Sequence, residues 1–384
     1  MVYDASREKC GIKEYGNALV KWLKALGVDL KICDLRKEKY VDSVISAICA
    51  LDSDLVHTQH EYGLFKGHWG WSHLFYYLTL KIFRKKDITT LHTVITPKQA
   101  LINFIKWDLS FKGAKLVDIL KGPITSYLSP FIPLIFTDKA IIHTLRGYSL
   151  IPWIGKMKAV FLPHFTPKSR KEVLEKWKEC KGKKGVPEVI EVVTPGFIRP
   201  TKRYDWAIHA LVSLKEEGFP KRIRYRIVGS PQDEVGERWL NIIKSFVEEI
   251  KEDLDKLGLE ISIETKFMSK EKLIETACNA DVVLLPYSDP TQEASGILHD
   301  SLTCGRHIVV LKIGDVRNYP KAFYPFELKD PLRGMKEALR KAFERLLKGE
   351  RCNENALAYA YYTAIDRIAE EHVKLYESLS RGRS

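Results

Sequence analysis

The sequence predicts an α/β protein of two domains, each a parallel β-sheet wrapped by helices. Short β-branched runs alternate with helical stretches along almost the whole chain. The chain has 384 residues, whereas a single core stops growing at roughly 250 to 300 residues. A highly charged stretch at 166–187 ends in glycine and proline, which is typical of a linker with one solvated helix. We therefore expect domains at residues 1–180 and 186–355, with a ligand cleft between them.

In the first domain, a helical pattern precedes a series of predicted strands. Tyr15, Leu19, Trp22, Leu23 and Leu26 recur at helical spacing. Met1 to Tyr3 leaves room for only a short opening strand, unless the chain starts upstream of Met1. The further strands are expected at Val28–Cys33, Leu55–Gln59, Ile88–Thr93, Ala140–Thr144 and Val160–Pro163.

The second domain repeats this alternation and is followed by an amphipathic helix. Its strands are expected at Val189–Thr194, Tyr225–Val228, Ile261–Phe267, Val282–Leu285 and His307–Lys312. The last helix carries an apolar stripe made of Ile365, Ile368, Ala369, His372, Tyr376 and Leu379. Ligands of parallel α/β sheets bind at the loops that follow strands, so functional residues are expected in those loops.

Charge and cysteine content narrow the choice of ligand and compartment. The chain has 62 Lys and Arg against 49 Asp and Glu, and its formal charge of +13 suits nucleic acid, acidic lipid surfaces or phosphorylated small molecules. Nucleic acid ranks lowest, because the cations are scattered and no nucleic-acid-binding module is recognisable.

The seven cysteines are far apart and never in a C-x-x-C pair, which argues against a disulfide framework or zinc site and favours a reducing compartment. Since neither a signal peptide nor a long apolar run is found, we expect a soluble, cytoplasmic protein.

The most informative segment is Asp281–Gly305, in which a buried strand, a polar loop and a helix follow one another. Ser295 and Gly296 are small residues at the predicted helix start, where open backbone N–H groups and the helix dipole favour a diphosphate. Glu293 precedes them and can accept hydrogen bonds from hydroxyls of the group that the phosphate carries. An ordinary loop with a helix N-cap explains this segment equally well.

A second segment, Val192–Asp205, is a strand that runs into a loop with three cations. Arg199 and Lys202 lie at the end of the strand and can neutralise a leaving diphosphate, whereas Arg203 is expected in solvent. Taken alone, a basic surface loop is the simpler interpretation.

Four histidines of the first domain, His57, His60, His92 and His143, lie in or just after predicted strands. A neutral imidazole there can bind sugar hydroxyls or act as a general base, although most such histidines only pack in a core. His60 and His92 are the better candidates because polar residues, Glu61 among them, are their neighbours. The histidines and acids show no metal-ligand spacing, so no metal is assigned.

Read together, these segments resemble the retaining, nucleotide-sugar-dependent family four of the GT-B glycosyltransferases. In chain order, the matching stretches are CGIKEYGNAL, DLVHTQHEYGLF, TTLHTV, KAIIHT, GFIRPTKRYDWAIHAL, YRIVGSP, ADVVLLPYSDPTQEASG and YYTAIDRIAEEHVKLYESL. The resemblance implies two Rossmann-like domains, with the donor held mostly by the second. It also implies that the last helix, 360–384, crosses back to pack on the first.

The resemblance also implies roles for individual residues. Lys202 matches the family lysine that contacts the donor diphosphate, and His92 matches the histidine near the transferred sugar. His60 and Glu61 are expected on the acceptor side. The implied donor-binding residues are Gly11 and Ile12 of the N-terminal loop, Gly229, Phe267 and Met268 near the base, and Ser295, Gly296, Ile297 and Ser301.

Two departures from the family pattern stand out. The usual Gly-Arg is here Gly196-Phe197, so Arg199 is expected to substitute for the arginine. The usual pair of glutamates falls on Ala294 and Ser301, while Glu293 and Asp300 each lie one position earlier. One residue turns a helical side chain by roughly 100°, so Asp300 is not expected to bind the ribose, whereas Ser301 can hold one hydroxyl.

The leading hypothesis is an enzyme that transfers a hexose from a nucleotide diphosphate sugar to an acceptor hydroxyl, with retention and without metal or cofactor. The acceptor is left open among glycans, lipid-linked molecules and small molecules. The alternative is a catalytically degenerate nucleotide-sugar or glycan-binding protein, favoured by the missing acidic pair and by Phe197.

Residues 67–86 combine aromatic residues with a basic end, as interfacial helices do. An anionic membrane is therefore a candidate partner, although a helix packed in the core is the simpler interpretation of this segment.

Overall fold

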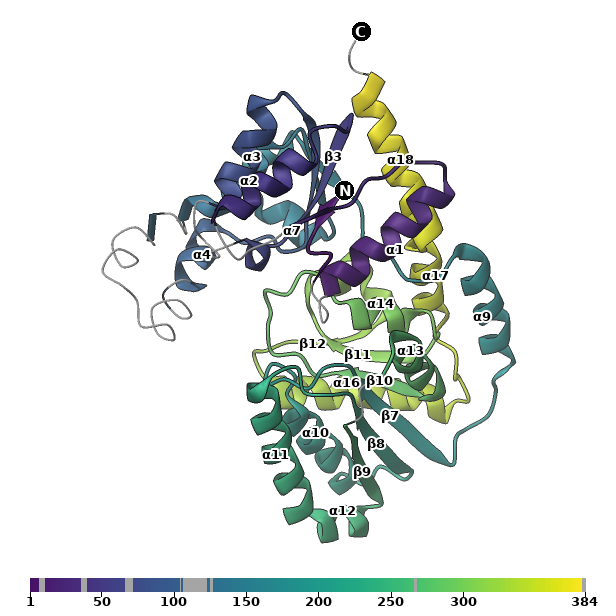
Figure 1. Cartoon of the computed structure of the whole chain (residues 1–384). Helices are drawn as coiled ribbons and strands as arrows, with labels where there is room; N and C mark the ends of the chain where they lie inside the picture. Colours follow the sequence, from purple (N-terminus) through teal and green to yellow (C-terminus); the bar gives the residue numbers. More distant parts are fainter. Residues whose placement is uncertain are drawn as a thin grey trace. The chain divides into compact units, whose positions relative to one another are not determined.

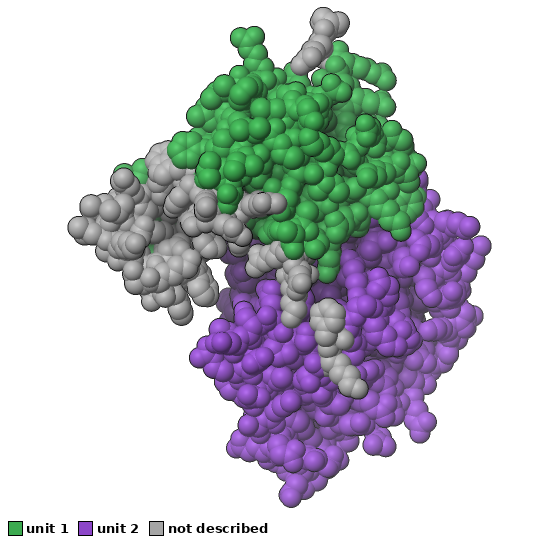
Figure 2. All heavy atoms as spheres, viewed as in Figure 1, with its two compact units in different colours: residues 1–164, 366–384 green, residues 165–365 purple. Residues whose placement is uncertain are grey.

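The computed structural model describes residues 1–6, 11–35, 40–65, 72–103, 105, 123–124, 127–265 and 268–381. The chain divides into two compact units (Figures 1 and 2). Unit 1 comprises Met1–His164 and Asp366–Ser384, and unit 2 comprises Phe165–Ile365. Each unit contains one parallel six-stranded sheet flanked by helices, which confirms the predicted α/β class with two Rossmann-like units.

The sheet of unit 1 has the strand order β2-β1-β3-β4-β5-β6. Its strands are β1 (Val2–Tyr3), β2 (Cys33–Asp34), β3 (Leu55–His60), β4 (Lys86–Leu91), β5 (Lys139–Ile142) and β6 (Ala159–Phe161). Its α-helices are α1 (Gly11–Ala25), α2 (Tyr40–Cys49), α3 (Ser72–Ile82), α4 (Pro97–Asn103), α6 (Ile132–Phe136), α7 (Leu145–Leu150), α8 (Trp153–Lys156) and α18 (Ile365–Arg381). Two 3₁₀ turns, η1 (Tyr62–Leu64) and η3 (Ser129–Phe131), complete the described elements.

The predicted strand at Val28–Cys33 is wrong in extent, because only its last residue joins β2. The chain leaves α1 through Gly27, which has a φ of 85°. The N–H groups of Gly27 and Val28 donate to carbonyls of Lys24 and Leu23, so this stretch closes the last turn of the helix instead of extending a strand.

The predicted return of the last helix to the first domain is confirmed. Ile368, Ala369 and His372 on α18 are buried in unit 1. The hydroxyl of Tyr376 lies 2.6 Å from Nδ1 of His57 on β3. Figure 1 shows α1 and α18 on one side of β3, with α2 and α3 on the other.

The sheet of unit 2 has the order β12-β11-β10-β7-β8-β9. Its strands are β7 (Val189–Pro195), β8 (Arg222–Val228), β9 (Leu259–Glu264), β10 (Val282–Leu285), β11 (His307–Leu311) and β12 (Tyr324–Phe326). Its helices are α9 (Arg170–Gly182), α10 (Tyr204–Glu216), α11 (Glu234–Glu249), α12 (Lys251–Leu257), α13 (Lys270–Asn279), α14 (Gly296–Leu302), α15 (Gly314–Asn318), η4 (Pro320–Ala322), α16 (Pro331–Leu347) and α17 (Glu354–Tyr362). The sequence did not predict β12, a three-residue strand that contains Pro325.

The charged segment predicted as a linker lies within unit 2, because that unit begins at Phe165. Helix α9 starts with a capping box in which Ser169 and Glu172 satisfy each other's backbone N–H groups. Val173 and Cys180 are the two buried residues of this helix, and they belong to the core of unit 2. A helix with a buried stripe of this kind is part of a domain.

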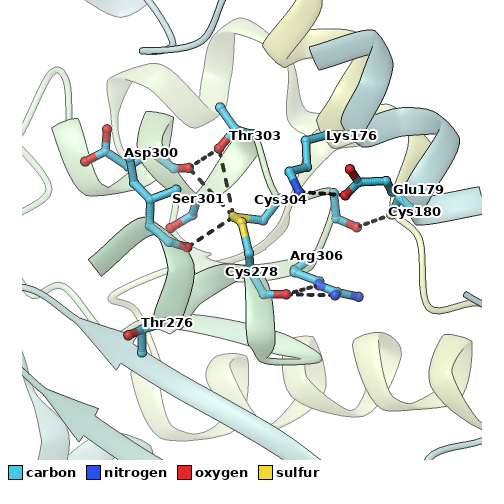
Figure 3. The surroundings of a disulfide bond; sticks show 12 residues. Lys176, Glu179, Cys180, Thr276, Cys278, Asp300, Ser301, Thr303, Cys304 and Arg306 are labelled. Atoms are coloured by element: carbon cyan, nitrogen blue, oxygen red, sulfur yellow. Dashed lines mark hydrogen bonds and ion pairs between the residues drawn. A yellow bond between two sulfur atoms is a disulfide. The ribbon is translucent and has the colours of Figure 1, made fainter. Parts of the chain in front are cut away.

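Three disulfides correct the prediction that the chain has no disulfide framework. They are Cys33–Cys49, Cys180–Cys352 and Cys278–Cys304, with Cα–Cα distances of 6.0, 5.4 and 4.7 Å. The partners are 16, 172 and 26 residues apart, so no short cysteine motif announces them. The expectation of a reducing compartment rested on that missing motif and loses its basis. Figure 3 shows Cys278 and Cys304 beside Asp300, Ser301 and Thr303 at the end of α14.

Candidate functional site

The predicted diphosphate-binding residues lie in loops at the carboxyl ends of three neighbouring strands, β8, β7 and β10. The loop after β7 is held on both sides by backbone hydrogen bonds. The N–H of Ile198 donates to the carbonyl of Ser230 over 3.0 Å, and the N–H of Arg203 donates to Pro286 over 2.9 Å. The loop that carries Arg199 and Lys202 is therefore fixed between the ends of β8 and β10.

Two glycines make this arrangement sterically feasible. Gly196 has a φ of 101° and Gly229 a φ of 155°, in a region that disfavours residues with a Cβ. A Cβ on Gly229 would lie 2.1 Å from the carbonyl oxygen of Gly196. A Cβ on Gly196 would lie 2.9 Å from Nζ of Lys202 and 3.1 Å from Cγ1 of Ile297. The structure thus brings the Lys202 ammonium and the first turn of α14 to the same place.

Lys202 is a buried cation, with 8% of its surface exposed. Its side chain folds back so that Nζ donates to the carbonyl of Pro195, at the end of β7, over 3.0 Å. Burial, followed by the charge of Arg199, lowers the pKa of Lys202 to about 7. Among the residues that the structure describes, no carboxylate lies within ion-pair distance of this ammonium. A buried lysine without an acidic partner at the end of a strand is suited to bind an anion.

The two arginines of the loop have different surroundings. Arg199 is exposed, and its guanidinium lies 5.9 Å from the ring of Phe197. Arg203 pairs with Asp205 and lies 4.1 Å from the ring of Trp206. Arg203 also borders a cavity of about 450 Å³ lined by Pro200, Arg203, Asp205, His209, Trp239, Ile242, Ile243 and Phe246.

The start of α14 is fixed by hydrogen bonds within unit 2. The Ser295 hydroxyl accepts from the N–H of Leu298 over 3.3 Å and lies 2.8 Å from the Tyr287 hydroxyl. The N–H of Ser295 donates to Oδ2 of Asp315 over 2.9 Å. Ser295 therefore positions the turn, while a Cβ on Gly296 would meet no atom within 4 Å. Open space for a ligand is found at Gly296 and not at Ser295.

The acidic and hydroxyl residues around α14 are mostly engaged. Glu293 is buried, and its backbone carbonyl, not its carboxylate, accepts from the backbone N–H of Asp315 over 2.8 Å. Oδ1 of Asp300 lies 3.3 Å from Nζ of Lys270. The Ser301 hydroxyl donates to the carbonyl of Ile297 over 2.7 Å, one turn earlier in the helix.

The sequence did not predict the buried His299–Asp315 pair that holds the first turn of α14 in place. His299 and Asp315 are both fully buried, with Nε2 and Oδ2 3.3 Å apart. Asp315 comes from the start of α15, shortly after β11, and holds Ser295 as described above. The only sequence signal was an acidic residue just after a buried strand, in Gly314-Asp315.

The remaining predicted donor residues are spread over both units. Met268 is partly buried against the core of unit 2, and Phe267 lies outside the described residues. Gly11 and Ile12 are the first two residues of α1 in unit 1, where Gly11 is exposed and Ile12 packs partly on the core.

In unit 1, His92 follows β4 and keeps part of its surface exposed. Its Nε2 lies 2.9 Å from Oε1 of Gln59, and its ring lies 4.8 Å from that of Tyr15 and 5.4 Å from that of His143. Burial, and secondarily His143, lowers the pKa of His92 well below its usual value, so the imidazole is neutral at pH 7. A neutral ring here can both donate and accept hydrogen bonds.

His60 and Glu61 end β3 and begin η1. His60 is fully buried, with Nδ1 3.0 Å from the Tyr77 hydroxyl. Glu61 caps η1 by accepting from the N–H of Tyr62 over 2.9 Å, and its other oxygen accepts from the Thr93 hydroxyl over 2.5 Å. Both side chains thus have partners inside unit 1. Among the described residues, no group of three or more His, Cys, Asp or Glu is placed to hold a metal ion.

Comparison with known proteins shows the fold. No protein-family model matches the sequence, and no curated protein matches it significantly. Among solved structures, sucrose-phosphate synthase from Thermosynechococcus elongatus is 14% identical, with a TM-score of 0.67 over 99% of this chain and 98% of that one. HepE from Anabaena, in complex with UDP, is 12% identical, with a TM-score of 0.64 over 98% and 99%. A glycosyltransferase from Rickettsia africae is 15% identical, with a TM-score of 0.64 over 98% and 97%. Over nearly its whole length, the chain therefore has the GT-B glycosyltransferase fold.

Proposed function

We propose that the protein transfers a hexose from a nucleotide diphosphate sugar to an acceptor hydroxyl, with retention of the anomeric configuration and without metal or cofactor. The observation that carries this proposal is Lys202, a buried ammonium with no carboxylate partner among the described residues. The fold supports it, since HepE has been solved with UDP and glucose, and another structure of this fold with UDP-2-fluoro glucose.

In this proposal Lys202 binds the donor diphosphate. When the bond from the sugar to the diphosphate breaks, negative charge grows on the leaving oxygen, and a fixed ammonium stabilises that charge. Binding of an anion raises the pKa of Lys202 from about 7, so the lysine is charged when the donor is present. Arg199 supplies a second cation from the same loop, Gly229 lets the Gly196 carbonyl pack against the turn after β8, and the space beside Gly296 is open for a phosphate.

The sugar and the base are assigned to the remaining residues. Glu293 and His92 would orient the transferred sugar, because a buried carboxylate and a neutral imidazole both bind hydroxyls. Met268 would lie near the base, and Ile297 and Gly296 near the diphosphate. On the acceptor side, Glu61 and His60 would support the acceptor indirectly, since His60 is fully buried. The acceptor is a glycan, a lipid-linked molecule or a small molecule.

A nucleotide-release assay tests the proposal. UDP- and GDP-sugars are incubated with the protein and an acceptor panel, and free nucleotide is measured. Lys202→Met keeps the length of the side chain but removes the charge, and it should lower kcat/KM by about 100-fold or more. Arg203→Gln changes the adjacent cation, which is already paired with Asp205, and should leave turnover within about three-fold. Unchanged turnover in Lys202→Met would remove the lysine from this role.

The alternative, a nucleotide-sugar or glycan-binding protein without catalysis, has one observation in its favour. The two residues nearest to the family's second glutamate are engaged elsewhere, Asp300 with Lys270 and Ser301 with its own helix. Calorimetry distinguishes the two functions. Binding of a nucleotide sugar that Lys202→Met abolishes, without nucleotide release for any acceptor, would support the binding protein.

A further inference from the structure

Exposed apolar surface is concentrated in unit 1. Of the 25 large hydrophobic side chains exposed among the described residues, 18 belong to unit 1 and seven to unit 2. Positive charge has the same bias. Unit 1 has 27 Lys or Arg and 18 Asp or Glu, a formal charge of +9, whereas unit 2 has 35 and 31, a charge of +4. A soluble protein rarely exposes apolar surface in quantity without a partner for it.

Part of this apolar surface gathers where the strands of unit 1 begin. Strands β3 to β6 are parallel, with Leu55 opposite Lys86 and Ile88 opposite Lys139, so their first residues share one edge of the sheet. Ile82, Phe83, Ile135 and Met157 lie in the segments that lead into β4, β5 and β6, and are 67, 57, 47 and 77% exposed. We call these four side chains the amino-edge patch.

Hydrogen bonds show that these segments are neighbours. Nζ of Lys85 donates to the carbonyl of Ser53 over 2.9 Å, which joins the end of α3 to the segment before β3. Nζ of Lys81 lies 2.9 Å from Asp138, which joins α3 to the start of β5. Nζ of Lys158 donates to the carbonyl of Ile135 over 2.7 Å, which joins α6 to the start of β6. The patch is therefore one region of a single unit.

Cations surround the amino-edge patch. Arg84, Lys85, Lys86, Lys139, Lys156 and Lys158 enter β4, β5 and β6, and among the described residues none of them forms an ion pair. The carboxylates of this region are mostly engaged. Lys81 lies 3.2 Å from Asp87 and 2.9 Å from Asp138, and Lys31 lies 2.7 Å from Asp52. Among the described carboxylates of this region, only Asp54, exposed before β3, is left to offset the six cations.

We propose that the amino-edge patch docks unit 1 on an anionic lipid surface. Exposed Phe, Ile and Met side chains can enter the headgroup region, while the surrounding Lys and Arg bind lipid phosphates. No helix of the described residues is long and apolar enough to cross a membrane, so the contact proposed is with the membrane surface. The proposal does not depend on the transferase function, because the carboxyl ends of β3 and β4, with His60 and His92, lie at the opposite edge of this sheet.

Vesicle co-sedimentation of the full chain tests the proposal. Vesicles of phosphatidylglycerol mixed with phosphatidylcholine are compared with vesicles of phosphatidylcholine alone, at low and high salt. One variant, Phe83→Ser/Met157→Ser, removes apolar side chains. A second, Arg84→Asn/Lys156→Ser, removes charge, and asparagine suits the φ of 52° at Arg84. The matched control, Lys329→Ser/Leu332→Ser, changes one exposed cation and one exposed apolar residue of unit 2.

We expect binding to the anionic vesicles that weakens with salt and is absent for phosphatidylcholine alone. Each cation near an anionic surface contributes about five-fold, so the charge variant should bind roughly 30-fold more weakly. The apolar variant should lose about 10-fold or more, while the control and the melting temperatures of all variants stay unchanged. Absent binding at low salt would overturn the proposal, as would equal losses in the control. Self-association that the apolar variant abolishes, without vesicle binding, would instead identify an interface between copies.

Discussion

At the scale of single residues, the low pKa of Lys202 should make nucleotide binding depend on pH if this lysine binds the donor as proposed. The pKa of the free lysine is about 7, and only its protonated form would bind the diphosphate. Above pH 7 the lysine must take up a proton on binding, so affinity should fall by up to about ten-fold per pH unit. Calorimetric dissociation constants between pH 6 and about 9 measure this slope. The slope should vanish in Lys202→Met, and an equal slope in both proteins would assign it to another group.

Gly229 gives a second prediction at this scale. A Cβ there would lie 2.1 Å from the Gly196 oxygen, whereas a Cβ on Gly218, which also has a positive φ of 85°, would meet nothing within 4 Å. Gly218→Ala should therefore cost only the backbone strain, about 1 kcal/mol of the free energy of unfolding. Gly229→Ala should cost about 3 kcal/mol or more, because the loops must also move apart. Urea denaturation of the two variants measures the difference, and equal losses would show that the approach of Gly196 to Gly229 is not rigid.

At the scale of elements, the disulfides tie helices together within unit 2. Cys278–Cys304 joins the end of α13 to the residues after α14 (Figure 3), and Cys180–Cys352 joins α9 to the segment before α17. On chain entropy alone, cross-links that close loops of 26 and 172 residues raise the free energy of the unfolded chain by about 3.5 and about 5 kcal/mol. Removing Cys180–Cys352 by serine substitution should therefore cost more unfolding free energy than removing Cys278–Cys304. Thiol labelling with and without reductant checks that the pairs exist, since labelling of all six cysteines without reductant would contradict them.

Prediction from sequence succeeded best for elements with a buried, regular pattern. Strands β7 and β10 are apolar along most of their length, whereas β3 and β4 are buried but mix apolar with polar residues. The sequence pattern locates all four within about two residues. The edge strands β2 and β12 were not predicted correctly, because β2 pairs over only two residues and β12 contains a proline.

The site shows the same limit. The place of Lys202 after β7 could be predicted from the strand-loop-helix pattern, while its role in binding a diphosphate stays a prediction. Asp315 and His299 could not, since their meeting depends on how two loops fold onto each other. The disulfide pairings could not be predicted for the same reason, because only the tertiary fold brings the paired cysteines together.

At the scale of the whole molecule, the buried histidines should make unit 1 the more acid-sensitive half. Burial lowers the pKa of His57, His60, His73, His92 and His372, to about 4 for His73 and His372, and all five belong to unit 1. In unit 2, burial likewise lowers the pKa of His307. The ordinary pKa of histidine is 6.5, so below about this pH the unfolded state binds more protons than the folded state.

The free energy of unfolding is unaffected by these histidines above pH 6.5. It decreases as the pH falls from there toward about 4, because the unfolded state takes up protons that the folded state does not. Each histidine contributes up to about 1.4 kcal/mol per pH unit in this range. Calorimetry between pH 7.5 and about 5 should show the transition of unit 1 falling faster than that of unit 2. Parallel shifts of both transitions would contradict the assignment, and His73→Gln, which cannot titrate, should reduce the fall.

The proposed function requires that Lys202, beside the first turn of α14, binds the diphosphate of a nucleotide sugar. A crystal structure of the protein with the nucleoside diphosphate that binds most tightly, among UDP, GDP and ADP, tests it most directly. We expect a phosphate oxygen within hydrogen-bonding distance of the Lys202 ammonium and next to Gly196, Gly229 and Gly296. A nucleotide whose diphosphate lies elsewhere, such as in the cavity bordered by Arg203 and Trp239, would contradict it.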